Sequence, residues 1–204
     1  MWILLLPFLA LPAQSAEPST PTVGGVEGGI AEMAPSPRLL GLELNVAWPL
    51  VPGVEMFQAR GTIAAWSAGT FHGDVVIAAN FRPGVYRDTE GTFTELGVGV
   101  GYRQYFWRGF HVEAAAYPSY AWLTDNVVTG ESYETFTVTI EGYVGYRFLL
   151  SELGLTSASS WPIEPSAVLQ VGAGGNAFPA NPWPTSEPGL PVFPVASLLV
   201  GAAF

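Results

Sequence analysis

The chain has 204 residues, of which 12% are charged and 49% are hydrophobic, with 24 glycines, no cysteine and a net charge of −10. The length fits one sizeable domain. Ordinary soluble domains carry roughly 25% charged residues, so this chain has too few charges for the surface of a water-soluble globule. The acidic balance argues against nucleic acid as a partner, because such binding needs a basic surface. The lack of cysteine excludes disulfides and thiolate metal sites.

The amino-terminal region predicts export. Residues 1–16 have an apolar core followed by Ala13, Ser15 and Ala16, small residues that fit cleavage by signal peptidase. An uncleaved hydrophobic anchor is the alternative. Residues 17–37 are rich in Pro, Gly and Ser and predict a flexible periplasmic leader.

From residue 38 onward the pattern excludes a helical membrane span and favours strands. No run of about 18 to 20 apolar residues occurs after the first dozen positions, so only a closed barrel could cross a bilayer. Apolar residues alternate with polar ones in eight segments: 38–48, 55–67, 73–83, 92–107, 109–123, 133–149, 163–178 and 192–204. Residues 38–204 therefore predict an all-β fold, an eight-stranded antiparallel up-and-down transmembrane β-barrel.

The connections suggest an orientation. "WRGF" between segments four and five is a tight turn, whereas the connections after segments three, five and seven are longer. Outer-membrane barrels have short periplasmic turns and longer outer loops, with both chain ends in the periplasm. The stretch after segment six is long for a periplasmic turn, and "PLVPG" after segment one is short for an outer loop.

Each segment has an apolar face and a polar face. The polar face includes glycines that suit a crowded lumen better than a solvent surface, namely Gly97, Gly99, Gly101, Gly172 and Gly174. The apolar face has aromatics near segment ends, as in interfacial girdles: Trp48, Phe81, Tyr102, Phe106, Trp122, Phe148 and Phe204. A soluble barrel with its apolar face inside is the alternative.

In the membrane orientation the lumen receives four acids and four arginines: Glu43, Glu95, Glu113, Glu141, Arg60, Arg82, Arg103 and Arg147. Charges in a narrow interior are costly unless they are paired, and arginine suits such pairing because its planar group binds carboxylates at two points. We expect an ion-pair network that plugs the lumen.

The eight segments and the terminal Phe204 resemble the small eight-stranded bacterial outer-membrane proteins, the class of OmpX and the OmpA barrel domain. The stretches "FRPGVYRDTEGTFTELGVGVGYRQYFWRGFHVEAA" and "NPWP" are similar to a group of such proteins without an established activity. The resemblance implies a bacterial outer-membrane location, a monomer, and outer-membrane lipid and lipopolysaccharide as surroundings. It also implies that Phe204 is an assembly signal for the barrel-assembly machinery, although Phe204 could simply belong to a girdle.

Catalytic and metal-binding groupings are weak. His111 and Glu113 share a face with Ser119, but Ser119 is about 25 Å from His111 along a strand, too far for a hydrolytic relay. His72 and Asp74 could ligate a metal, but we expect them to lie in a solvated turn.

The predicted outer loops carry acids that could bind divalent cations but that solubility explains as well: Asp88, Glu90, Asp125, Glu131 and Glu134. The loop aromatics Tyr86, Tyr133 and Trp183 could form a recognition surface or anchor the chain at the membrane. The sequence therefore predicts no enzyme, cofactor or metal, and a structural or adhesive role. A lipid-modifying or lipid-binding enzyme and a narrow small-solute channel are the alternatives.

Overall fold

The computed structural model describes residues 39–52, 54–68, 71–154, 163–179, 183–185 and 192–204. The predicted signal peptide and leader, residues 1–16 and 17–37, lie outside these ranges. Within them, no helix has the length and apolar character needed to cross a membrane.

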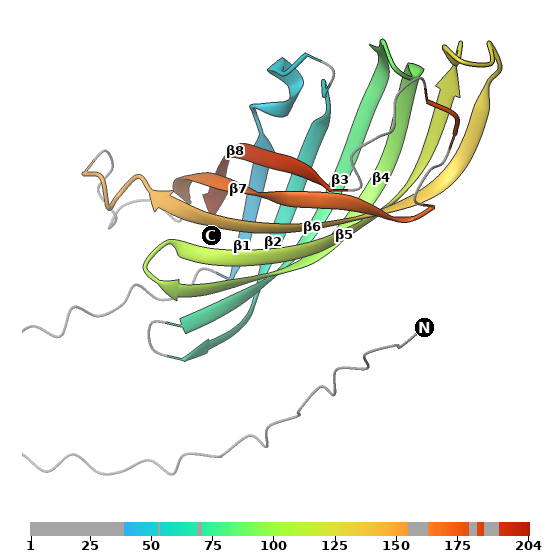
Figure 1. Ribbon diagram of the computed structural model, residues 1–204. Coiled ribbons are helices and arrows are strands. Elements are labelled where there is room, and N and C mark those ends of the chain that lie inside the picture. The colour runs from blue at the N-terminus through green and yellow to red at the C-terminus, as the bar shows by residue number, and fades with distance from the viewer. Residues whose placement is uncertain (1–38, 53, 69–70, 155–162, 180–182, 186–191) are drawn as a thin grey trace, which may run out of the picture. The chain divides into compact units, whose positions relative to one another are not determined.

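The described residues form a closed ring of eight antiparallel strands (Figure 1). The strands are β1 (Leu40–Asn45), β2 (Phe57–Ala68), β3 (Phe71–Arg87), β4 (Gly91–Trp107), β5 (Phe110–Thr124), β6 (Tyr133–Leu149), β7 (Glu164–Phe178) and β8 (Phe193–Ala203). Each strand pairs with the next, and β1 pairs with β8 from Gly41↔Ala203 to Asn45↔Leu199. The all-β, up-and-down arrangement predicted from the alternation is therefore confirmed.

The two ends of the ring differ in their connections. We call the end that carries residues 39 and 204, together with the β2–β3, β4–β5 and β6–β7 connections, the terminal end. The opposite end, which carries the other four connections, is the far end. At the terminal end Phe204 closes the ring, since its N–H and C=O both bond to Leu40, at 2.9 and 3.0 Å.

The first strand is shorter than expected because Asn45 ends it. The Asn45 carboxamide oxygen accepts hydrogen bonds from the backbone N–H of Ala47 (3.1 Å) and Trp48 (3.2 Å), which starts the 3-10 turn η1 (Trp48–Leu50). Trp48 is only 6% exposed and donates from Nε1 to the carbonyl of Ala196 at 2.6 Å. The prediction of Trp48 as an outward girdle aromatic is wrong, and the β1–β2 connection is longer than the sequence indicated.

β-Bulges explain two irregular places in the alternation. In β2 the register shifts between Ala64 and Trp66, so that Trp66 joins the outward set although its parity differs from that of Phe57. In β3 a second shift lies between Arg82 and Val85, where Pro83 and Gly84 look like turn residues in the sequence. Strand β3 therefore continues to Arg87, and the β3–β4 connection is only residues 88–90, shorter than predicted.

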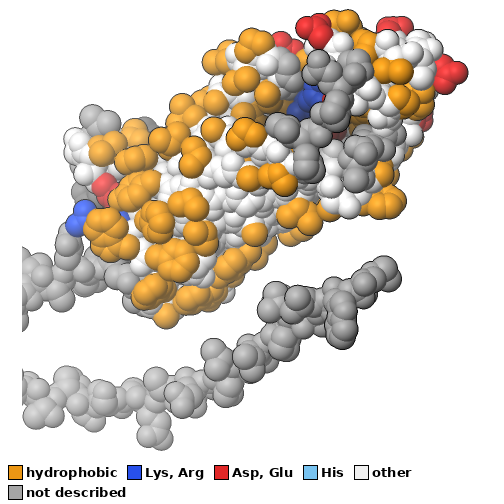
Figure 2. Space-filling view, in the orientation of Figure 1, with side chains coloured by type: hydrophobic (Ala, Val, Ile, Leu, Met, Phe, Trp, Pro, Cys, Tyr) orange, Lys and Arg blue, Asp and Glu red, His pale blue; other side chains and the backbone are white. Residues whose placement is uncertain are grey.

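The two faces of the sheet have opposite character. On β4 the apolar Val98 (62%) and Val100 (58%) are exposed on the outside, whereas Arg103 is fully buried inside. Hydrophobic side chains cover much of the visible face over the strands, while acidic side chains gather at one tip (Figure 2). The charged face lies inside the ring, as the sequence predicted.

The interior glycines lie where neighbouring side chains need room. A Cβ at Gly97 would be 2.7 Å from the Cβ of Ser119, and one at Gly101 would be 2.8 Å from the Cβ of Ala115. At Gly99 the missing side chain makes way for the ring of Tyr117. Gly99 thus allows the large side chain of Tyr117 on β5 to fill the interior, while Gly97 and Gly101 allow close contact with β5 at Ser119 and Ala115.

Candidate functional site: the buried ion-pair cluster

Arg103 on β4 is the centre of a charged cluster inside the ring. Its Nη1 and Nη2 donate to the two carboxylate oxygens of Glu43, at 2.6 and 2.9 Å, and its Nε donates to Glu113 at 2.8 Å. Nη1 also donates to the hydroxyl of Tyr105 at 3.1 Å. The planar guanidinium of Arg103 makes this two-point contact with the Glu43 carboxylate, which the ammonium group of a lysine could not make.

Glu113 extends the cluster to a second arginine. The other carboxylate oxygen of Glu113 pairs with Nη2 of Arg60. Glu113, Arg60 and Arg103 are buried, as Glu43 is, and none of the four is more than 3% exposed. We call Glu43, Arg60, Arg103 and Glu113 the ion-pair cluster. Its members come from β1, β2, β4 and β5. The pair of Glu43 and Arg103 joins β1 to β4, and the pair of Arg60 and Glu113 joins β2 to β5, so the cluster connects strands that are not neighbours in the ring.

The energetics of such a cluster are asymmetric. Two carboxylates and two arginines leave it without net charge, and every member has an ionic partner. Removing charges from water is costly, so a buried ion pair adds little over a well-packed apolar pair, but breaking one destabilises a protein by about 3–5 kcal/mol. Loss of one member of the cluster should therefore cost more than the intact cluster contributes.

Arg82 and Glu95 form a separate pair toward the far end. Their contact is 3.1 Å long, and Arg82 also donates from Nε to the carbonyl of Val54 at 2.9 Å. Ser119 donates to the second oxygen of Glu95 at 2.6 Å and shares a hydrogen bond with Thr137 at 2.8 Å. The Ser119 hydroxyl is thus engaged in packing the interior.

Arg147 lies toward the terminal end and contacts residues that the sequence placed in a turn. It is 3.7 Å from the carboxylate of Asp74, 3.4 Å from Nε2 of His72, and 4.4 Å from the ring centre of Tyr105. The prediction of a solvated turn at His72 and Asp74 is wrong, because β3 begins at Phe71 and points Asp74 into the interior. His72 stacks on Tyr105 with ring centres 4.1 Å apart.

Glu141 does not join the other charges. The hydroxyl of Tyr143 donates to it at 2.5 Å, and no ion pair of Glu141 occurs within the described residues. Of the eight charged residues that the sequence placed in the lumen, four make the ion-pair cluster, Arg82 and Glu95 pair with each other, and Arg147 faces Asp74 instead. Asp74 was missed although it has the same parity as Arg82.

His111 has a structural environment. Its Nδ1 is 3.0 Å from the carbonyl of Gly109 and its Nε2 is 3.4 Å from the carboxamide oxygen of Gln170. In the part of the chain that the structure describes, no group of three His, Cys, Asp or Glu side chains is arranged to hold a metal ion.

The far end of the interior is filled by an apolar cluster: Phe93, Ala121, Leu123 and Trp183, with Tyr133 packed against it. Trp183 is 8% exposed, its ring centre is 5.3 Å from that of Phe93, and its Nε1 is 3.4 Å from Glu90. A hydrogen bond of 2.8 Å from Asn126 to the carbonyl of Pro184 holds the same segment. Trp183 is thus not a surface aromatic as predicted, whereas Tyr86 is exposed.

Comparison of the chain with protein-family models, with curated proteins and with solved structures finds no match.

Proposed function

We propose that the chain is a β-barrel that spans a bacterial outer membrane, with a closed, ion-paired interior and a structural or surface-interaction role. The observation that carries this proposal is the inversion of the two faces: apolar side chains are exposed around the outside while the ion pairs are buried inside. Water as the surrounding solvent would favour the reverse arrangement. Hydrocarbon favours the one observed.

Rows of aromatic residues support the proposal. At the far end, one outward row runs across the neighbouring strands β2 to β6. It consists of Phe57, Phe81, Leu96, Tyr120 and Phe136. At the terminal end Phe110 pairs with Tyr146, and Phe71 lies 6.4 Å from Phe106. We call these the two girdles, after the aromatic girdles of membrane barrels.

The spacing of the girdles matches a bilayer. Phe71 and Phe81 on β3, and Phe110 and Tyr120 on β5, are ten residues apart. Ten residues span about 33 Å along a strand, which at a tilt of about 40° corresponds to an apolar band about 25 Å tall. Between the girdles many outward residues are aliphatic, as at Leu42, Ile77 and Val100, although Tyr102 is exposed there as well.

A specific observation favours a surface-interaction role. Strands β3 to β6 continue past the far-end girdle, and the β6 residues 133–137 pair with β5 but, within the described residues, not with β7, whose pairing begins at Val138↔Phe178. An unpaired strand edge can accept an extended segment of a partner. On this proposal the far end faces outward and the acids near it, including Asp88 and Asp125, meet the cell exterior.

The same orientation puts the terminal end in the periplasm. Phe204, exposed on the outside of the ring, then lies in the periplasmic girdle and is available as the signal for the barrel-assembly machinery. Lipid and lipopolysaccharide surround a monomer. The proposal assigns no reaction, cofactor or metal to the interior.

A charge in the middle of the exposed apolar face tests the membrane proposal. Arginine at the bilayer midplane costs about 2–4 kcal/mol, so we expect Val100→Arg to lower the yield of chain that folds into lipid vesicles, measured by heat-modifiable gel mobility. Val128→Arg, in the exposed β5–β6 connection, is the matched control and should fold like the wild type. The proposal fails if Val100→Arg folds equally well into vesicles, or if the wild type is a soluble monomer in water without detergent.

A further inference from the structure

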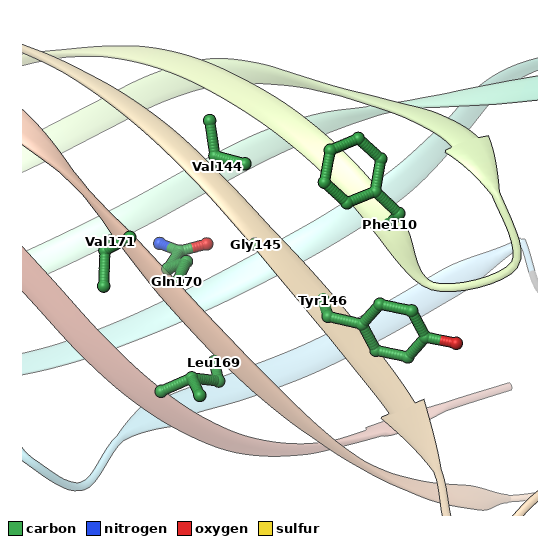
Figure 3. A pocket seen from close by; sticks show the side chains of 7 residues that line it. All are labelled: Phe110, Val144, Gly145, Tyr146, Leu169, Gln170 and Val171. Atoms are coloured by element: carbon green, nitrogen blue, oxygen red, sulfur yellow. The ribbon is translucent and has the colours of Figure 1, made fainter.

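A groove lies on the outer face of the sheet where β5, β6 and β7 run side by side (Figure 3). Its volume is about 270 Å³, and it is lined by Phe110, Val144, Gly145, Tyr146, Leu169, Gln170 and Val171. The rings of Phe110 and Tyr146 stand on one side and the branched side chains of Val144, Leu169 and Val171 on the other. The Tyr146 hydroxyl points away from the groove.

The strand register explains the groove. One outward row consists of Phe110, Tyr146 and Leu169, and the next includes Val144 paired with Val171. The row after that is Ala114, Gly142 and Ala173, whose side chains are small or absent, and a Cβ at Gly142 would have nothing within 4 Å. The outer surface therefore falls away from the terminal-end girdle toward the middle of the apolar face.

The floor of the groove is fixed from the inside. A Cβ at Gly145 would be 2.6 Å from the Cβ of Gln170 and 2.7 Å from the carbonyl oxygen of Leu169, so no side chain fits there. The carboxamide of Gln170 is buried and directed toward His111 in the interior. The walls that a ligand would meet are therefore apolar, and nothing in them would hold a charged group.

We propose that this groove binds one acyl chain of a membrane lipid, an inference that rests on the proposed membrane location. The groove is continuous with the exposed apolar face and begins at the terminal-end girdle, the level at which headgroups give way to acyl chains. A lipid whose headgroup lies beyond Tyr146 would direct its chain along the groove toward Gly142. Its volume equals that of about nine water molecules at about 30 Å³ each. A methylene group is of similar size, so the groove fits a segment of one chain.

Packing, not transfer from water, provides the preference for this position. Bulk lipid tails are as apolar as the groove, so a hydrophobic driving force is absent. A chain that follows the groove fills a depression whose walls would otherwise lose dispersion contacts. We therefore expect an acyl chain to occupy the groove several-fold more often than other outward positions. The bound lipid should still exchange with the surrounding bilayer.

Photocrosslinking tests the inference. The full chain is folded into vesicles of phosphatidylethanolamine and phosphatidylglycerol that contain a small fraction of phosphatidylcholine with a diazirine in one acyl chain, and adducts are mapped by peptide mass spectrometry. We expect adducts to be several-fold enriched at Val144, Leu169 and Val171 over outward residues on β2 to β4, such as Val98.

Variants that fill the groove sharpen the test. Val144→Trp and Val171→Trp should each reduce the adducts at Leu169 several-fold, whereas Val98→Trp, which adds the same side chain to the outer face elsewhere, should not. Uniform labelling of all outward residues, or unchanged adducts in both groove variants, would overturn the inference while leaving the membrane proposal intact. Crosslinks between two copies through this face would overturn it in favour of a dimer interface. A chain with no lipid adducts on any strand would instead contradict the proposed function itself.

Discussion

At the scale of single residues, Arg103 has the most demanding position in the ring. It is fully buried, it contacts both Glu43 and Glu113, and its guanidinium satisfies each carboxylate with hydrogen bonds of normal length. Arg60 compensates one oxygen of Glu113 but has no ionic contact with Glu43. Removing the Arg103 charge therefore leaves Glu43 as a buried carboxylate without a cation.

We expect Arg103→Met to destabilise the folded ring by about 3–5 kcal/mol, the usual cost of breaking a buried pair by removing one partner. Arg103→Lys should lie between this variant and the wild type, because a single ammonium cannot reproduce the two-point contact. Urea unfolding in vesicles measures the free energies. Arg108→Met, in the exposed β4–β5 turn, is the control and should change stability little. An Arg103→Met variant as stable as this control would refute the role given to the cluster.

The sequence predicted which residues face inward but not which partners they choose. Parity alone puts Glu43, Arg103 and Glu113 on one face, because side chains alternate strictly along a strand. Their contact across the interior depends on how the closed ring brings β1 opposite β4, and no local pattern contains that information. Glu141 illustrates the limit: it has the expected parity, but its partner is Tyr143 on its own strand, two residues along.

At the scale of elements, the strands depend on interruptions that the sequence pattern makes ambiguous. Pro83 and Gly84 are turn residues by composition, but in β3 they lie at a bulge within a long strand. The weak alternation of β2 has the same origin, since the shift between Ala64 and Trp66 reverses parity. Strand existence was therefore predictable, and the ends of β4 to β8 fall within one residue of the predicted segments. The bounds of β1, β2 and β3 differ more, and so do the lengths of the β1–β2 and β3–β4 connections.

The inner and outer glycines of these strands have different roles and allow a matched comparison. A side chain at Gly99 would collide with the ring of Tyr117, which fills the interior, whereas a side chain at Gly142 would enter open space on the outer face. We expect Gly99→Leu to destabilise the ring by about 1–3 kcal/mol, the usual cost of overpacking, and Gly142→Leu to be nearly neutral. Heat-modifiable gel mobility across a urea series measures both. Equal stability of the two variants would contradict a filled interior.

At the scale of the whole molecule, the interior contains two successive obstructions. The ion-pair cluster links β1 and β2 to β4 and β5, and nearer the far end Phe93, Leu123 and Trp183 pack together. A hydrated ion that travels through the ring would have to displace both. We therefore expect the proposed closed interior and not the alternative of a channel.

Conductance in planar bilayers distinguishes a closed interior from a channel. We expect the wild type to show no steady openings. The double variant Glu43→Ala/Arg103→Ala removes one acid and one base, so the interior charge is unchanged and Arg60 remains paired with Glu113. Because two large side chains are lost, this variant should pass ions more often than the wild type, while Gly142→Leu on the outer face should not. Steady, large openings of the wild type would show that the cluster yields to permeating ions. That result would contradict the proposed closed interior and would indicate a channel that opens and closes.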